Sequence, residues 1–283
     1  MADDKITRSK GNTVEFTLTI PWASVTKAKE EALGELSQSL EIKGFRKGKA
    51  PKALVEKHIN PEKLTQELLN HLLPRAYAQA VNDSGVKPII LPTIKIVETG
   101  NNQDWVFTAT TCEAPTVKLD SYQQKLKNHL SSSGIWVPGS SKTAPQKKDE
   151  KIQTVIDWLV KNIEVELSGI LISEEINHLL TKLLDQLQKL GLTVEQYLSS
   201  KKMTQDQLKE EYKTIAIDNL KLEFILAAVA SQEKTFPTKD EVDKLIGSAE
   251  PSLSENLKDK ANLKTIHAAL TRSKTLDFLA QLA

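Results

Sequence analysis

The residues best suited to contact a partner lie in one short run, Gly44-Phe45-Arg46-Lys47-Gly48-Lys49-Ala50-Pro51. Glycine adopts backbone angles closed to other residues, and proline fits the first turn of a helix, so the run predicts a loop between two helices. An aromatic ring on such a loop can fill an apolar pocket, and the cations can pair with phosphate or carboxylate. The alternative is that Phe45 packs onto its own domain and the cations are merely solvated. The residues alone favour this alternative slightly.

Hydrophobic periodicity predicts the elements that position this loop. In chain order they are a strand over 13–20, a helix over 24–40, a short helix over 51–59, a long helix from Asn60-Pro61 to Gly85 kinked at Pro74, and a hairpin of strands over 93–99 and 104–113. One early strand, several helices and a final hairpin make an α+β domain, which ends near Pro115.

The run from Gly44 to Pro51 resembles the ribosome-docking loop of the trigger factor family of bacterial ribosome-associated chaperones. The family pattern is Gly-Phe-Arg-x-Gly-Lys-x-Pro, and all six specified residues are present. The resemblance implies a ribosome-binding domain over residues 1–115 that docks beside the exit tunnel and contacts protein and rRNA of the large ribosomal subunit. The ribosome-binding residues that it implies are Gly44, Phe45, Arg46, Lys47, Gly48, Lys49 and Pro51.

The middle of the chain, residues 116–148, predicts a helix over 117–130 followed by a linker rich in serine, glycine and proline that reaches about Lys148. Typical members of the family carry a prolyl isomerase domain of FKBP type here. Such a domain needs on the order of 100 residues. The linker is too short to hold one, so we expect the isomerase domain to be missing and the chain not to be an enzyme.

Residues 149–283 give helical signals throughout. We predict a helix with an apolar stripe from Ile152 to Ile163, a helix capped by Ser173 and closed by Gly191, three capping boxes (Thr193 with Gln196, Thr204 with Gln207, Thr238 with Glu241), and a last helix over 254–282. The segment from Val165 to Ile176 resembles the family's entry into its first arm helix, with Ser168 in place of the usual proline, and 191–198 is similar to another family segment. The resemblance implies an all-α chaperone domain with long helical arms around a crevice for unfolded clients.

The apolar residues of this helical half have two interpretations. They form either an ordinary bundle core or, in part, a surface for clients. The residues that suggest an apolar excess are Leu179, Leu183, Leu187, Phe224, Ile225 and Leu226. The residues favour the bundle core for most of them, and the resemblance implies that some of this surface stays exposed to clients.

Composition excludes several classes of function. The 283 residues carry a net charge of +1, which argues against bulk nucleic-acid binding by the whole chain, although 43–63 contains seven basic and two acidic residues. The single cysteine, Cys112, excludes an intramolecular disulfide or a cysteine metal cluster, and we expect it to be buried as a small hydrophobe. The five histidines lack helical zinc spacing, and no phosphate-binding glycine motif occurs. We therefore predict no catalytic residue, no metal site and no cofactor.

The starting segment Met1-Ala2-Asp3-Asp4-Lys5 lacks the apolar core of a signal peptide. No apolar stretch is long enough to span a membrane. We therefore expect a cytoplasmic protein without a membrane partner. The favoured function is an ATP-independent chaperone that binds the ribosome near the exit tunnel and shields nascent or unfolded polypeptides. The alternatives are a prolyl isomerase, a general holdase or RNA-binding module without ribosome docking, and a periplasmic chaperone. A homodimer remains open.

Overall fold

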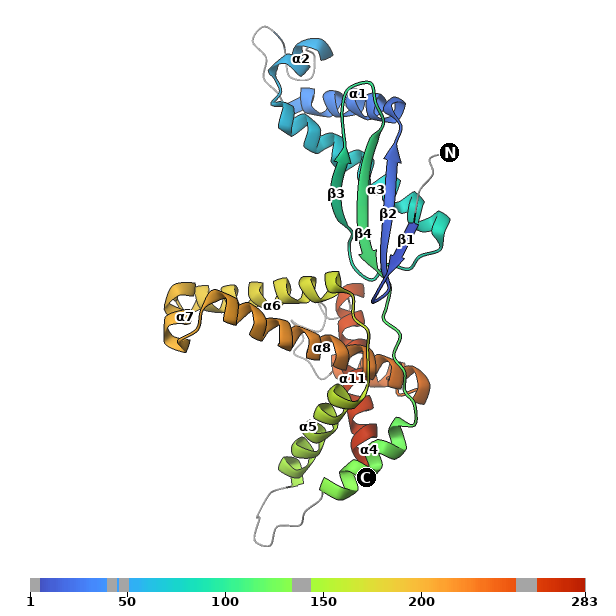
Figure 1. The fold of residues 1–283 in the computed structure, drawn as a ribbon, viewed down its shortest axis with the longest axis vertical. Coiled ribbons are helices and arrows are strands. Elements are labelled where there is room, and N and C mark those ends of the chain that lie inside the picture. Colours follow the sequence, from blue (N-terminus) through green and yellow to red (C-terminus); the bar gives the residue numbers. More distant parts are fainter. Residues whose placement is uncertain (1–5, 40–44, 46–50, 134–143, 248–258, 283) are drawn as a thin grey trace. The chain divides into compact units, whose positions relative to one another are not determined.

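The computed structural model describes residues 6–39, 45, 51–133, 144–247 and 259–282. The chain divides into two compact units, Met1–Ala114 and Pro115–Ala283. The first unit combines a sheet with helices, and the second is largely helical (Figure 1). The predicted α+β and all-α halves are therefore confirmed.

The sheet of the first unit has four antiparallel strands in the order β1-β2-β4-β3. The strands are β1 (Ile6–Ser9), β2 (Thr13–Ile20), β3 (Thr93–Glu98) and β4 (Trp105–Cys112). The predicted first strand and hairpin are confirmed, but the expectation of a single early strand is wrong. Strand β1 has one large apolar residue, Ile6, and no detectable alternation. It is extended because it pairs with β2, from Ile6 opposite Phe16 to Ser9 opposite Thr13.

Two long helices cover one face of this sheet and leave the other face open (Figure 1). The helices of the unit are α1 (Trp22–Ser39), α2 (Lys52–His58) and α3 (Pro61–Ser84). The side chains of Phe16 and Phe107 are fully buried between the sheet and these helices. Helix α3 begins as predicted, because the Asn60 side chain accepts a hydrogen bond from the N–H of Glu62, and it ends at Gly85, which has a φ of 68°.

The second unit is built of helices, four of which pack around one apolar core. Its helices are α4 (Tyr122–Ser133), α5 (Ala144–Asn162), α6 (Gly169–Lys189), α7 (Val194–Lys201), α8 (Gln205–Glu233), α9 (Lys239–Gly247) and α11 (Lys260–Gln281). The fully buried residues Leu126, Leu159, Ile225 and Leu279 bring α4, α5, α8 and α11 together. All three predicted capping boxes are present, at Thr193, Thr204 and Thr238.

Three predicted boundaries in the second unit are wrong. The last helix, predicted over 254–282, begins only at Lys260, after the non-helical Asp259, and 254–258 lie outside the described residues. The helix predicted over 117–130 begins only at Tyr122, because Val117 is extended and forms a β-bridge with Val165. The linker predicted to reach Lys148 ends earlier, because α5 begins at Ala144. Trp136 and Val137, which the sequence placed in this linker, lie outside the described residues.

The start of α6 corrects a further prediction. Ser173 does not cap the helix: it lies within the first turns, and its hydroxyl donates to the carbonyl of Gly169 at 2.9 Å. The cap is Ser168, whose Oγ accepts from the N–H of Ile170 at 3.3 Å and which is almost fully buried. A serine at the place of the family's usual proline therefore fixes the turn by capping.

Candidate functional site

The loop between α1 and α2 carries the residues that the sequence singled out. Phe45 is 43% exposed and belongs to none of the buried clusters. Pro51 is exposed and extended, with a φ of −58° and a ψ of 138°, and α2 begins directly after it. The partly exposed ring argues against the interpretation in which Phe45 packs into its own domain. The other predicted members, Gly44, Arg46, Lys47, Gly48 and Lys49, lie outside the described residues.

A small separate core holds the two helices that flank this loop. Its buried members are Leu33, Leu36, Val55 and Ile59, with Leu64 of α3 packed against them. The ammonium of Lys29 on α1 also pairs with the carboxylate of Glu56 on α2 at 2.6 Å. The ends of the loop are thus fixed by packing that does not use Phe45, which leaves that ring available for a partner.

The second unit has an extension of its own, the arm formed by α6, α7 and the first half of α8 (Figure 1). Its core is a second small leucine cluster, in which Leu183, Leu187, Leu198 and Leu208 are buried. Helix α6 ends at the tip of the arm, where the N–H of Leu192 donates to the carbonyl of Leu187 at 2.9 Å and Gly191 has a φ of 68°.

The core interpretation, which the sequence favoured for most of the apolar residues of this unit, holds for four of the six, while Leu179 and Phe224 are partly exposed. Leu183, Leu187, Ile225 and Leu226 are buried, so for them the bundle-core interpretation holds. The exposed large apolar residues of the arm are Leu184, Leu190, Leu192 and Ile215. Leu190 is 71% exposed, and it flanks Gly191 together with Leu192. The sequence did contain a signal for this exposed surface, namely the two leucines on either side of the glycine that ends α6. Residues at a helix end have few neighbours that could bury them.

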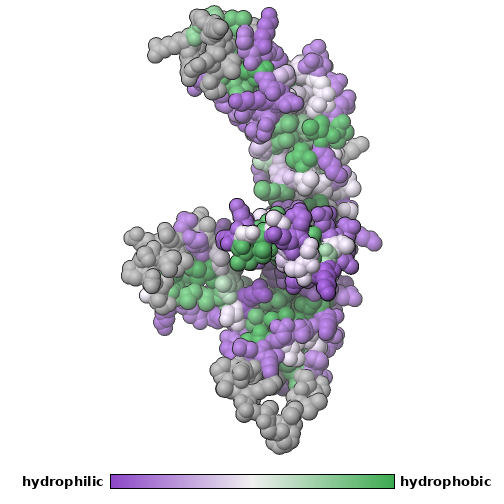
Figure 2. Space-filling model, turned by 90° about the vertical axis from the view of Figure 1, so that its left-hand side faces the viewer, coloured by the Kyte–Doolittle hydropathy of each residue, from purple (hydrophilic) through white to green (hydrophobic). Residues whose placement is uncertain are grey.

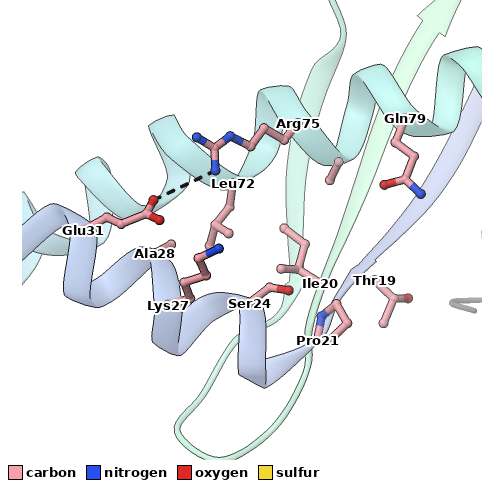
Figure 3. Close-up of a pocket in the computed structure, with 11 residues that line it drawn as sticks. Thr19, Ile20, Pro21, Ser24, Lys27, Ala28, Glu31, Leu72, Arg75 and Gln79 are labelled. Carbon is pink, nitrogen blue, oxygen red and sulfur yellow. Dashed lines mark ion pairs between the residues drawn. The ribbon is translucent and has the colours of Figure 1, made fainter.

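Each unit also contains a hollow beside its helices. In the first unit a pocket of about 290 Å³ lies between α1, α3 and the end of β2, with Glu31 and Arg75 4.0 Å apart across it and Leu72 on its wall (Figure 3). In the second unit a groove of about 490 Å³ lies between α5 and α8. Its apolar residues are Ile156, Val160 and Leu222, and its other lining residues are Gln153, Asp157, Lys161, Asp218, Asn219 and Lys221.

Two strongly perturbed titratable groups hold pairs of helices together in the second unit. Burial raises the pKa of Tyr122 to about 12, and its hydroxyl donates to Glu233 at 2.9 Å, which ties α4 to α8. The Lys274 ammonium, which donates to Glu241 at 2.9 Å, lowers the pKa of that carboxyl to about 2 and ties α9 to α11. Cys112 is fully buried on β4, as predicted. Within the described residues, no three His, Cys, Asp or Glu side chains are grouped to hold a metal ion.

Comparison with known families accounts for both halves of the chain. The family model of the bacterial trigger factor protein matches residues 3–131, and the model of the trigger factor C-terminus matches residues 140–281, half of the chain. The chain belongs to the trigger factor family. Trigger factors are chaperones that take part in protein folding, and in this member only the N-terminal and C-terminal trigger factor domains are detected, with no FKBP-type domain between them.

The relatives differ in how much of their length this trigger factor matches. The trigger factor of Carboxydothermus hydrogenoformans is 24% identical over 410 positions, which cover 95% of this chain and 96% of the relative. Because this chain has only 283 residues, more than a hundred of those positions have no counterpart in it. The trigger factor of Staphylococcus aureus strain JH9 is 33% identical over 116 residues, which span 41% of this chain and 27% of the relative.

A solved structure supports the fold. A trigger factor chaperone described as showing promiscuous substrate recognition in folding and assembly activities has a TM-score of 0.64, with 15% identity, and the match covers 98% of this chain and 99% of that one. Among the helices that are described here, none is long and apolar enough to cross a membrane.

Proposed function

We propose that this trigger factor binds the large ribosomal subunit near the exit tunnel through the α1–α2 loop and shields nascent or unfolded polypeptides without ATP. The observation that carries the docking proposal is the partly exposed ring of Phe45, held outside the small core that fixes both ends of its loop. Arg46, Lys47 and Lys49 adjoin the ring in sequence. Their positive charges suit the phosphates of rRNA or acidic side chains of a ribosomal protein.

The shielding part of the proposal rests on the second unit. Unfolded polypeptides differ in sequence but share exposed apolar side chains, and apolar contact needs no fixed geometry. The arm offers Leu184, Leu190 and Leu192 for such contacts, and the α5–α8 groove offers Ile156, Val160 and Leu222 between polar rims. A general holdase that does not dock on ribosomes would use the same surfaces, so the loop decides between the two functions.

The docking test is cosedimentation with purified ribosomes of the full chain carrying Phe45→Ala, Arg46→Ala and Lys47→Ala. We expect binding to be lost at moderate salt while far-UV circular dichroism and melting stay unchanged. A matched control carries Leu91→Ala, Lys10→Ala and Lys87→Ala, which remove one exposed apolar side chain and two exposed cations from the same unit and should not affect binding. Normal ribosome binding by the loop variant would leave the general holdase as the function.

Single substitutions separate the two kinds of contact. A plot of the logarithm of the binding constant against the logarithm of the salt concentration has a negative slope. Removing one cation that neutralises an rRNA phosphate should make this slope less steep by about 0.7–0.9. Phe45→Ala should weaken binding by about 1.5–3 kcal/mol and leave that slope unchanged, because the ring contributes apolar burial. An unchanged salt slope in Arg46→Ala and Lys47→Ala would assign those cations to a ribosomal protein and not to rRNA.

We also propose that the chain does not catalyse prolyl isomerisation. The matches to the N-terminal and C-terminal domains are separated by residues 132–139 alone, far fewer than a domain requires. A refolding reaction limited by proline isomerisation, with a phase of tens of seconds, should keep its rate when the protein is added. Acceleration by catalytic amounts would overturn this part of the proposal.

A further inference from the structure

Apolar residues of the first unit reach its surface in two ways. On β3 and in the segment before it they are openly exposed; they are Ile89, Leu91, Ile96 and Val97. Figure 2 faces the side on which β3 lies in Figure 1, and it shows hydrophobic residues gathered on this part of the unit. Between α1 and α3 the apolar residues are instead recessed in the pocket of Figure 3. A recess limits a ligand by size and shape, so the pocket is the more selective surface.

The floor of this pocket is apolar and fixed in place. Ile20, Ala28 and Leu72 are at most 8% exposed and belong to the main core of the unit, and Ala76 packs against that core. Because the two alanines are short, the space between α1 and α3 beside them is left unfilled. The volume of about 290 Å³ lies at the small end of the roughly 300–1,000 Å³ typical of ligand pockets. It suits one aliphatic side chain with a small polar group attached.

The rim of the pocket is polar and carries more positive than negative charge. Its cations come from both helices, Lys27 from α1 and Arg75 from α3, and Figure 3 shows the two side chains reaching toward the same space beside Leu72. Among the described residues that line the pocket, Glu31 is the one carboxylate. The remaining polar residues of the rim are Thr19, Ser24 and Gln79.

Neither cation of the rim is strongly neutralised. The guanidinium of Arg75 lies 4.0 Å from the carboxylate of Glu31, at the outer limit of an ion pair, and its side chain is 75% exposed. Such a pair contributes little. Lys27 has no ion-pair partner in the part of the chain that the structure describes. An entering carboxylate therefore meets two cations, of which only Arg75 has a competing partner.

We propose that this pocket binds an aliphatic carboxylate, with a branched aliphatic group against Ile20, Ala28 and Leu72 and the carboxylate between Lys27 and Arg75. Two kinds of molecule present this chemistry. One is a polypeptide whose last residue is aliphatic, because its terminal carboxylate lies beside that side chain. The other is a free acylated amino acid such as N-acetyl-leucine. In both, the acylated nitrogen is uncharged and does not repel the cations. The pocket contains no residue of the α1–α2 loop, so this inference does not rest on ribosome docking.

The charges of the rim predict changes of opposite sign. Lys27→Ala and Arg75→Ala should each weaken carboxylate binding about three- to fivefold, because each removes one exposed ion pair. Glu31→Gln should strengthen binding by a similar factor, because it removes a like charge and frees Arg75 for the ligand. Lys95→Ala, which removes an exposed cation on β3, is the matched control and should leave binding unchanged.

Calorimetric titration of the full chain tests the proposal with three probes: N-acetyl-alanyl-alanyl-leucine with a free carboxylate, the same peptide ending in an amide, and N-acetyl-leucine. The free-acid peptide should bind and the amide should not, whereas a purely apolar client surface would bind both. Tighter binding of the acid peptide than of N-acetyl-leucine would assign the site to polypeptide C-termini, and equal binding would assign it to small acids.

A pocket-filling variant locates the site. Ala76→Leu places a larger side chain in the hollow and should abolish binding of the free-acid peptide, with circular dichroism as the check that the unit is folded. If that variant unfolds, the rim variants decide. The proposal is overturned if the free-acid peptide does not bind, if acid and amide bind equally, or if Lys27→Ala, Arg75→Ala and Glu31→Gln all bind like Lys95→Ala.

Discussion

The α1–α2 loop and the α6–α8 arm are built alike but present different chemistry. Each is an extension with a small leucine-rich core of its own, separate from the main core of its unit. Beyond its core the loop exposes the ring of Phe45, which cations adjoin in sequence, whereas the arm exposes several separate leucines. A ring with flanking charges matches a partner of one fixed shape and sign. Scattered leucines make non-directional contacts that suit partners of many sequences.

The difference suggests a physical rule for chaperones of this kind. Binding to a constant partner can use charge, because the positions of phosphates or carboxylates on that partner do not change. Binding to varied unfolded chains cannot rely on any fixed charge and depends on apolar surface. The two extensions should therefore respond to different substitutions and to different solution conditions.

The largest expected effect is a separation of the two activities. Leu184→Ser, Leu190→Ser and Leu192→Ser together should remove most of the delay in aggregation of a denatured client, measured by light scattering, yet leave ribosome cosedimentation unchanged. The loop variant with Phe45, Arg46 and Lys47 replaced by alanine should do the reverse. Leu245→Ser, an exposed leucine on α9, is the control for Leu190→Ser. If the arm variant also lost ribosome binding, the two extensions would not act independently.

A smaller effect separates the core of the arm from its surface. Leu187 is buried in the arm cluster and Leu184, on the same helix, is half exposed. Leu187→Ala should destabilise the arm by about 2–4 kcal/mol because it leaves a cavity, seen as faster amide hydrogen exchange in α6 to α8. Leu184→Ala should leave exchange nearly unchanged and affect only client protection. Equal exchange in both variants would show that the leucine cluster does not hold the arm.

The smallest effect concerns the start of the arm. Ser168→Ala removes the side-chain cap of α6 and should cost about 1 kcal/mol, measured by denaturant unfolding. Ser173→Ala on the same helix should change stability by less than about 0.5 kcal/mol, because its hydroxyl donates only to a carbonyl already used by the helix. A larger loss of stability in Ser173→Ala than in Ser168→Ala would restore Ser173 as the cap that the sequence suggested.

Much of the fold was predictable because its signals are local. Strand β2 was predicted at its observed bounds from alternation between Thr13 and Ile20, and the three capping boxes need only residues three positions apart. Strand β1 could not be predicted in this way, because its only strong cause is pairing with β2. The candidate loop was predictable from its residue types, but the exposure of Phe45 was not, because exposure depends on which residues fill the small core beneath it.

The sequence by itself determined the helices, the strands with clear alternation, the burial of Cys112 and the place of the basic loop, since each follows from residue type and spacing within a few turns of chain. Tertiary structure alone decided between Ser168 and Ser173 as the cap of α6, because both serines offer the same hydroxyl and only Ser168 has the extended backbone beside Val165, which bridges to Val117. It also decided which leucines are exposed, because Leu184 and Leu187 have the same side chain and differ only in whether α7 and α8 lie against them.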